Sequence, residues 1–288
     1  MIVGHTMTLV MNAEQSLQNG DPVSALKFLQ EEVRLKPSDA KLRIFLFQLY
    51  SLLGQWERAL NQLEVIAQLD DAALAMVQAY REAITCEALR AQVFAGKTSP
   101  MVLGAPDQWL AFMIEARLLA GQGKTAESHA FLKRAFEEAP TSSGTINDQA
   151  FTWIADADMR LGPVIEAIIN GRYYWVPFSR LTRIVIDAPE DLRDLVWMPA
   201  HLWFDNGGES VALMPTRYPG TETSTDGQLL LARKTIWEEP EPDMYCGLGQ
   251  RIFTTDNSEI PLMNTREICL DTVQPTSDKE PIEREYHG

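Results

Sequence analysis

The strongest constraint on the fold is a spacing of 34 residues in the first part of the chain. At this spacing the segment "NGDPVSALKFL" at 19–29 aligns with "LGQWERALNQL" at 53–63. Four positions coincide, and they pair Gly20 with Gly54, Ala25 with Ala59, Leu26 with Leu60, and Leu29 with Leu63. Such a period is typical of stacked helix–turn–helix units, in which glycine occupies the turn and a small alanine lets the paired helices approach closely. The chain is therefore expected to begin with an array of paired helices.

Further helices are expected after these two units. Pro37 ends the first unit as in a tetratricopeptide repeat, and a degenerate third unit has its glycine turn at Gly121. Between them, a long apolar ladder predicts a helix that starts at an N-cap, Asp71, and stops at Gly96. Asp107 is expected to cap another helix. The region therefore resembles a tetratricopeptide array interrupted by one long helix.

The second half of the chain has a different period. Short runs rich in β-branched and aromatic residues alternate with clusters of Pro, Gly, Asn and Asp, and Asn206-Gly207-Gly208 predicts a hairpin turn. We predict an α+β fold, with an all-helical tetratricopeptide-like domain at 1–140 and a polar linker at 141–150. A mainly antiparallel β domain with one or two helices follows at 151–270. The charged, Pro-containing tail at 271–288 is expected to be disordered.

Composition limits the partners and the compartment. The 288 residues carry a formal charge of -15, which favours solubility and repels nucleic acid and anionic membranes. No apolar run is long enough to span a bilayer, and the N-terminus lacks the features of a signal peptide. The three cysteines, Cys86, Cys246 and Cys269, form no CxxC pair and are expected to be reduced packing residues. We therefore predict a cytoplasmic protein.

Two aspartates raise the question of an active site. Asp156 and Asp158 precede an apolar run and the aromatic sequence Tyr173-Tyr174-Trp175. On a helix the two carboxylates would point to opposite sides, and on an extended segment they would share a face without an obvious third metal ligand. We interpret them as N-caps of a helical turn, with Pro163 opening a short helix that Gly171 ends. As caps, they would each contribute about 1 kcal/mol.

The aromatic sequence allows two interpretations. On a strand, Tyr173 and Trp175 face one side while Tyr174 and Val176 face the other, so both faces carry apolar surface. A strand buried on both faces gives this pattern without a ligand, whereas an exposed aromatic face would mark a partner-binding patch. Burial statistics favour the core.

Other chemical motifs are incomplete. The segment "GQGKTAES" at 121–128 has the Gly-Lys-Thr ending of a phosphate-binding loop but lacks the earlier glycine and the preceding strand. The acidic "WEEPEPD" at 237–243 is expected to be a solvated loop. The histidines are too scattered for a helical zinc pair, and they are His5, His129, His201 and His287. We find no catalytic constellation and predict no cofactor and no metal.

Four sequence blocks carry a family resemblance. They are "IFLFQLYSLLGQWERALNQLEVIAQLD", "AYREAITCEALRAQVFAG", "WIADADMRLGPVIEAIINGRYYWVPFSR" and "DLRDLVWMPAHLWFDNGGESVALMPTRYPG". In this order they strongly resemble the ImpE family over about residues 11–270. The resemblance implies a non-catalytic accessory protein of the bacterial type VI secretion apparatus. It also implies two partners, the N-terminal helix of the small sheath subunit TssB and the disassembly ATPase ClpV.

The matching blocks also indicate signature positions at 153–160, 171–178 and 197–208. With two aromatic residues of the helical half, the candidates for partner binding or family signature are Trp56, Tyr80, Trp153, Asp156, Asp158, Arg160, Tyr173, Tyr174, Trp175, Trp197 and His201. We expect the segment at 156–180 to be a structural seam between the two halves and part of a partner-binding face.

Two alternatives remain open on the sequence. One is a small-molecule-binding or hydrolytic protein that uses Asp156, Asp158 and His201 around an aromatic pocket, which requires those side chains to converge. The other is a general tetratricopeptide scaffold for a different client. Under the adaptor hypothesis the negative charge favours a basic, amphipathic partner helix.

Overall fold

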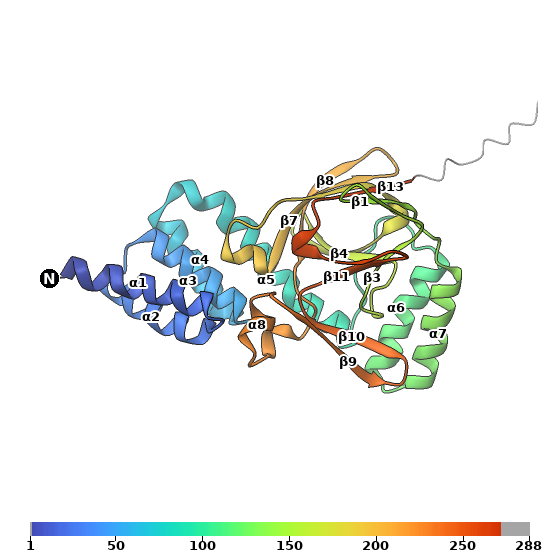
Figure 1. Ribbon diagram of the computed structural model, residues 1–288, viewed down its shortest axis with the longest axis horizontal. Coiled ribbons are helices and arrows are strands. Elements are labelled where there is room, and N and C mark those ends of the chain that lie inside the picture. The colour runs from blue at the N-terminus through green and yellow to red at the C-terminus, as the bar shows by residue number, and fades with distance from the viewer. Residues whose placement is uncertain (1, 272–288) are drawn as a thin grey trace, which may run out of the picture.

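A computed structural model describes residues 2–271, with side chains from residue 10 onward. The predicted disordered tail at 271–288 therefore lies outside the described residues, apart from Asp271. The chain folds into a helical part followed by a β-rich part (Figure 1). The helices before the first strand are α1 (Ile2–Gln18), α2 (Pro22–Leu35), α3 (Ala40–Leu52), α4 (Trp56–Leu69), α5 (Leu74–Phe94), α6 (Gln108–Gly121) and α7 (Thr125–Glu138). The predicted all-helical region is confirmed.

The repeated glycines and alanines occupy the turns and helix contacts that their spacing predicts. Gly20 and Gly54 adopt φ values of +81° and +64° at the α1–α2 and α3–α4 turns, a conformation that favours glycine. Ala25 and Ala59 are fully buried where the paired helices meet. Asp21 caps α2 by accepting a hydrogen bond from the Ser24 backbone N–H at 2.9 Å. The two hairpins are thus set by local turn and cap chemistry together with small apolar contacts.

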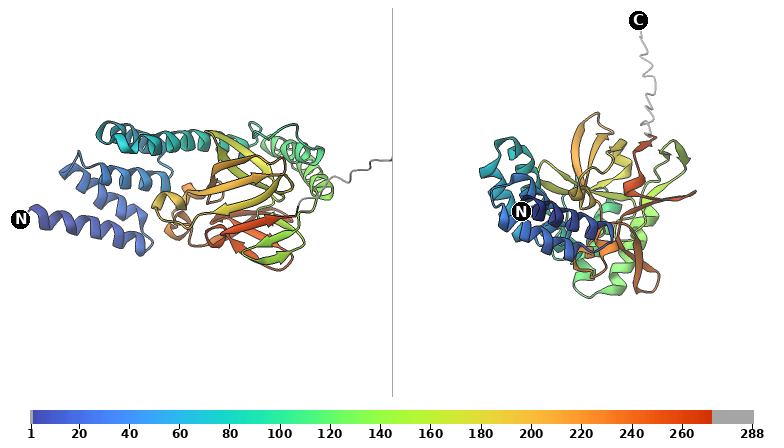
Figure 2. Two further views of the ribbon diagram at one scale, coloured as in Figure 1. Left: turned by 90° about the horizontal axis from the view of Figure 1, so that it is seen from above. Right: turned by 60° about the vertical axis from the view of Figure 1, so that its left-hand side comes forward.

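Helix α5 links the repeats to the β-rich part. Seen from above, it runs from the repeats toward the sheet, and α6 and α7 lie at the end of the molecule away from the N-terminus (Figure 2). The predicted cap at Asp71 is wrong by one residue: Asp70 accepts from the Ala72 N–H and starts a short 3-10 helix, Asp71–Ala73, ahead of α5. Asp107 does stand at the N-cap position of α6, without a side-chain cap bond.

The β-rich part contains two packed sheets and a separate hairpin. An eight-stranded antiparallel sheet has the order β2-β1-β13-β6-β7-β8-β4-β5, and a three-stranded sheet has the order β12-β11-β3. The remaining pair, β9–β10, forms a ribbon that reaches toward α7 (Figure 1). The strands are β1 (Gly144–Ile146), β2 (Gln149–Phe151), β3 (Ile154–Asp156), β4 (Val164–Ile169), β5 (Arg172–Pro177), β6 (Leu181–Ile186), β7 (Trp197–Phe204), β8 (Glu209–Pro215), β9 (Thr235–Glu241), β10 (Met244–Gly249), β11 (Ile252–Thr255), β12 (Glu259–Pro261) and β13 (Glu267–Leu270). A short helix, α8 (Gly227–Leu230), precedes β9.

The large sheet has a core on each face. On one face Trp175 and Trp197 join the core of the helices, and on the other Val176 and Met198 join a core shared with Phe253 of the small sheet. The predicted alternation along β5 is therefore observed, with Tyr173 and Trp175 fully buried against the helices. Because one core spans α1 to the sheet, the helical and β-rich parts pack as a continuous unit.

Three local predictions are wrong. The predicted linker at 141–150 contains β1 and the start of β2, because this segment pairs with β13 at the sheet edge. The predicted helix between Pro163 and Gly171 is strand β4, which is buried on both faces, and a doubly buried strand has the same unbroken apolar run as a buried helix. The predicted acidic loop at 237–243 lies mostly on β9, where most side chains face solvent.

The hairpin prediction at Asn206-Gly207-Gly208 is confirmed, since β7 and β8 pair across this turn and Gly207 has φ +82°. All three cysteines are free thiols, and Cys86 and Cys246 are buried as expected. Among residues 2–271, none of the helices combines the length and the apolar character that crossing a bilayer requires.

Candidate functional site at the junction of helices and sheet

Asp156 and Asp158 are buried ion-pair partners and do not cap a helix. Asp156 ends β3, forms an ion pair with Arg251, and accepts hydrogen bonds from the Tyr218 hydroxyl at 3.0 Å and the Asp158 N–H at 2.9 Å. Asp158 follows in a turn and pairs with Arg160, whose Nε donates at 2.9 Å. It also accepts from the Gly247 N–H at 2.9 Å. The two aspartates thus attach β3 to β10 and β11. Asp158 also accepts the Arg160 backbone N–H at 2.8 Å and so caps a single turn, whereas the cap interpretation is wrong for Asp156.

Glu166 extends this pairing toward α5. Its strand, β4, points the carboxylate at Arg90, which donates from Nε at 2.6 Å and from Nη2 at 3.0 Å. Arg251 pairs with the same carboxylate, and the Tyr173 hydroxyl donates to it at 2.6 Å. Glu87, one helical turn from Arg90, accepts from the Trp197 indole at 2.8 Å. We call Glu87, Arg90, Asp156, Glu166 and Arg251 the charged joint.

The carboxylates of the charged joint have opposite pKa shifts. Burial acts to raise the pKa of Glu166, but the neighbouring Arg90 and Arg251 outweigh it and lower that pKa to about 2. Burial together with the nearby Asp158 raises the pKa of Asp156 to about 6, against the lowering effect of Arg251. Burial also raises the pKa of Glu87. The two arginines are therefore compensated most strongly through Glu166.

An aromatic row joins the repeats to the same sheet face. The rings of Phe47 and Tyr80 are 5.5 Å apart, those of Tyr80 and Trp197 5.7 Å, and those of Trp197 and Trp56 5.8 Å. These spacings are typical of favourable tilted aromatic pairs. Burial raises the pKa of Tyr80 to about 12, so its hydroxyl stays protonated at neutral pH. Three candidates from the sequence, Trp56, Tyr80 and Trp197, thus come together in space.

The other candidates divide into two groups. Arg160, Tyr173 and Trp175 join the junction, and the Trp175 indole donates to the Tyr173 hydroxyl at 2.8 Å. Trp153, Tyr174 and His201 lie elsewhere: Trp153 is 39% exposed ahead of β3, and Tyr174 packs on the opposite core.

His201 lies on β7, where it stacks on Trp203 with ring centroids 4.1 Å apart and faces Glu209 at 3.8 Å. Among the described residues it shares no ion-pair partner with Asp156 or Asp158, which pair with Arg251 and Arg160. The convergence that an Asp–Asp–His site requires is therefore not observed.

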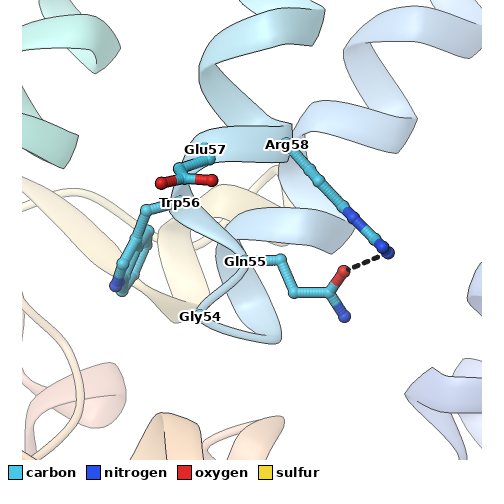
Figure 3. A pocket seen from close by; sticks show the side chains of 5 residues that line it. All are labelled: Gly54, Gln55, Trp56, Glu57 and Arg58. Atoms are coloured by element: carbon cyan, nitrogen blue, oxygen red, sulfur yellow. Dashed lines mark hydrogen bonds between the residues drawn. The ribbon is translucent and has the colours of Figure 1, made fainter.

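Two openings adjoin Trp56. The first is an open pocket of about 530 Å³ at the α3–α4 turn, lined by residues 54–58 (Figure 3). In it, Trp56 and Arg58 point to different sides, and Arg58 donates to the Gln55 side chain at 2.9 Å. The second, of about 270 Å³, lies between Trp56, Phe94 and Glu222 and has Glu87 and Arg90 in its wall. Trp56 therefore connects the repeat surface to the charged joint.

The sequence interpretation missed Arg90, Glu166 and Arg251 as parts of this junction. One signal was available for Glu166: Asn170 and Gly171 both have positive φ, and Asn-Gly between apolar runs predicts a tight β-hairpin rather than a helix end. Nothing local marks Arg251, because its partners lie far away in the sequence. Arg90 has one local partner, Glu87 at 3.3 Å, but its contact with Glu166 spans 76 residues. Among the described residues, no group of three or more His, Cys, Asp or Glu side chains is arranged to hold a metal ion.

Comparison with known proteins assigns the family. Residues 148–269 match the family described as ImpE protein, and residues 16–81 match the tetratricopeptide repeat. A relative from Pseudomonas aeruginosa, described as type VI secretion system accessory component TagJ, is 49% identical over 261 residues, which cover 91% of this chain and 92% of that protein. The chain belongs to the ImpE family. In this ImpE-family chain the matched region holds Asp156, Glu166 and Arg251, while Arg90 comes from α5 outside it.

A solved structure shares the fold. The crystal structure of protein VPA1032 from Vibrio parahaemolyticus superimposes with a TM-score of 0.82, covering 90% of this chain and 97% of that one at 24% identity. The similarity extends across both halves, so the attachment of a helical array to a two-sheet β part is common to the two proteins.

Proposed function

We propose that this ImpE-family protein is a non-catalytic accessory protein of the bacterial type VI secretion apparatus that acts in the cytoplasm. In this proposal it binds the N-terminal helix of the small sheath subunit TssB and links the sheath to the ATPase ClpV. The observation that carries the accessory role is the 49% identity with the accessory component TagJ over 91% of the chain. The identity extends through both the helical and the β-rich halves.

The geometry of the helical half supports a helix-binding role. Stacked helix pairs present surfaces that hold a peptide or helix, and the pocket at residues 54–58 opens at the turn of one such pair. Trp56 forms one wall of this pocket and is held by its contact with Trp197, so it offers a rigid aromatic anchor. Glu57 is exposed at the pocket and suits a basic side chain on the partner helix.

The junction supports a structural rather than a catalytic role. The carboxylates of Asp156 and Glu166 are fully engaged by Arg251, Arg90 and tyrosine hydroxyls. Groups held in this way stabilise one arrangement of helices and sheet, and they are not open to a substrate. We therefore assign the joint to positioning the repeat surface.

The test is a calorimetric titration of the full-length protein with a peptide covering the first helix of TssB. We expect saturable one-to-one binding that weakens as salt rises, because exposed charge pairs are screened. Glu57→Lys should weaken binding about fivefold or more, since it reverses one charge at the pocket. Glu127→Lys is the matched control, because Glu127 is likewise exposed in the first turn of the second helix of a pair.

Absence of saturable binding to the wild type would overturn the TssB part of the proposal. If Glu57→Lys and Glu127→Lys weaken peptide binding equally, the pocket at residues 54–58 is not the binding site. The ClpV part needs its own measurement, co-sedimentation of purified ClpV with the protein saturated by the TssB peptide. ClpV that sediments alone under those conditions would contradict the linking role.

A further inference from the structure

A third opening lies far from the repeat pocket in the sequence and shares none of its lining residues. It is a groove of about 460 Å³ between α7 and the β9–β10 ribbon, which approach each other in Figure 1. Its lining is mainly apolar and includes Leu132, Phe136, Met159, Pro242 and Met244, with His129 and three charged side chains completing it. Its volume and its apolar walls are those of a small-molecule site.

The groove adjoins a small inner chamber. Leu132 and Met244 line both spaces, and the chamber is also lined by Arg117, Arg160 and Ser128. The chamber has a volume of about 10 Å³, which is room for about one water molecule. Met244 separates the two spaces with a flexible thioether side chain, which can rearrange at little cost. An apolar groove therefore leads to a polar end that carries two arginines.

Arg117 is the unusual group in this chamber. Its Nε is buried without a hydrogen-bond partner, while the residue as a whole is partly exposed. Burial and the nearby Arg160 lower the pKa of Arg117, since both disfavour its charged form. Arg117 is partly buried, and a buried N–H donor without a partner is costly, so an oxygen acceptor placed in the chamber would stabilise it.

The neighbouring acids are already engaged. Asp158 is paired with Arg160 and accepts from the Gly247 N–H. The Oε2 atom of Glu241, on β9, forms an ion-pair contact of 2.8 Å with the Nε2 atom of His129 at the side of the groove, and it accepts no hydrogen bond. Ser128 donates its hydroxyl hydrogen to the Ala116 carbonyl at 2.8 Å. The Nε–H of Arg117 is thus a donor that a ligand could satisfy.

We infer that the groove binds a small monocarboxylate with an unbranched apolar chain, the carboxylate on Arg117 and the chain along Leu132 and Phe136. A carboxylate matches the planar guanidinium in shape and charge, and a charge-assisted hydrogen bond is stronger than a neutral one. An alcohol of the same chain length would leave the charge on Arg117 uncompensated, and an ammonium ion would be repelled. This site is independent of the proposed sheath-binding role.

The experiment compares three ligands with the same chain on the full-length protein, octanoate, 1-octanol and octylammonium, by calorimetry below their micelle concentrations. Octanoate should bind saturably at one site, and about tenfold more tightly than either of the others, in line with one charge-assisted contact. Because this series uses the wild type alone, its outcome does not depend on how any variant folds.

The variant Arg117→Met supplies a second test, in which ligand affinity and stability should change in opposite directions. It should weaken octanoate binding about tenfold and raise the melting temperature of the ligand-free protein, because it removes a buried donor, Nε, that has no partner. Arg81→Met, at an exposed position on α5 outside the groove, is the control and should change neither quantity. A variant that binds octanoate as tightly as the wild type would overturn the assignment to Arg117.

Equal affinity for the three head groups would also overturn the inference. A further ligand, an acetylated tripeptide ending in a free leucine carboxylate, tests whether a protein chain end is the true occupant. Saturable binding of this peptide without binding of octanoate would replace the small-molecule assignment by a chain-end site.

Discussion

The repeat array and the charged joint hold the molecule together in different ways. In the array, α1–α4 meet through apolar and small residues, such as Ala59 and Leu63, that recur at a fixed spacing. In the joint, Arg90 of α5 meets Glu166 of β4, and Glu166 meets Arg251, which lies between β10 and β11. The first kind of contact is encoded locally and repeats, whereas the second occurs once and depends on the complete tertiary fold. An error in the array therefore leaves a cavity, but an error in the joint leaves a buried charge.

The largest expected effect comes from breaking the joint at Arg251. Arg251→Met would leave Asp156 and Glu166 buried with one counter-ion fewer, and we expect it to lower the free energy of unfolding by about 3–5 kcal/mol. Urea denaturation followed by tryptophan fluorescence measures this loss. If Arg251→Met lowers the free energy of unfolding no more than the exposed control Arg172→Met does, within experimental error, solvent reaches the joint.

A cavity in the array should cost somewhat less. Leu63 is fully buried in α4, and Leu63→Ala is expected to lower the free energy of unfolding by about 2–4 kcal/mol, through lost transfer energy and the remaining cavity. The same denaturation experiment applies. The exposed Leu35→Ala in α2 is the control, and a comparable loss there would contradict the assignment of Leu63 to the array core.

The joint should also give stability a pH dependence opposite in sign to that of the array cap Asp21, whose pKa is lowered by its hydrogen bonds with Ser24. The pKa of Asp156 is about 6 in the folded protein, above its ordinary value of 3.8, so folding takes up a proton between these pH values. The contribution of Asp156 therefore falls as pH rises from 4 to 6, by about 1–3 kcal/mol in total.

Asp156→Asn removes this titration while keeping a side-chain acceptor for Arg251. The difference in unfolding free energy between wild type and variant should therefore change across pH 4–6 and stay constant above pH 7. Denaturation at a series of pH values measures it. A difference that is flat over the whole range would place the pKa of Asp156 outside this window.

The smallest effect is expected for a true helix cap. Asp21 accepts the Ser24 N–H at the start of α2, and Asp21→Ala should lower the free energy of unfolding by about 1 kcal/mol. This variant sharpens the contrast with Asp156 and Asp158, which sequence reasoning also assigned as caps. If Asp158→Ala cost no more than Asp21→Ala, the pairing of Asp158 with Arg160 would be energetically neutral.

Several features of the fold were predictable because their causes are local. Glycine tolerates the positive φ of the turns at Gly20 and Gly54, so these turns could be placed from the sequence. The helix pairs follow from the 34-residue spacing of apolar positions, and the β7–β8 hairpin follows from its Asn-Gly-Gly turn. The strand β4 was predictable in principle from Asn170-Gly171, but its apolar run is equally compatible with a buried helix. The failure there came from a pattern that both structures share.

By itself, the sequence determined the tetratricopeptide-like array, the α+β class, the family and the alternation of aromatic residues along β5. Only the tertiary structure decided that Asp156 pairs with Arg251, that Glu166 faces Arg90, and that the Nε of Arg117 is left without a hydrogen-bond partner. The physical reason is range. Turn, cap and periodicity signals act within a few residues, whereas an ion pair depends on which distant segments the packed sheets and helices bring within hydrogen-bonding distance.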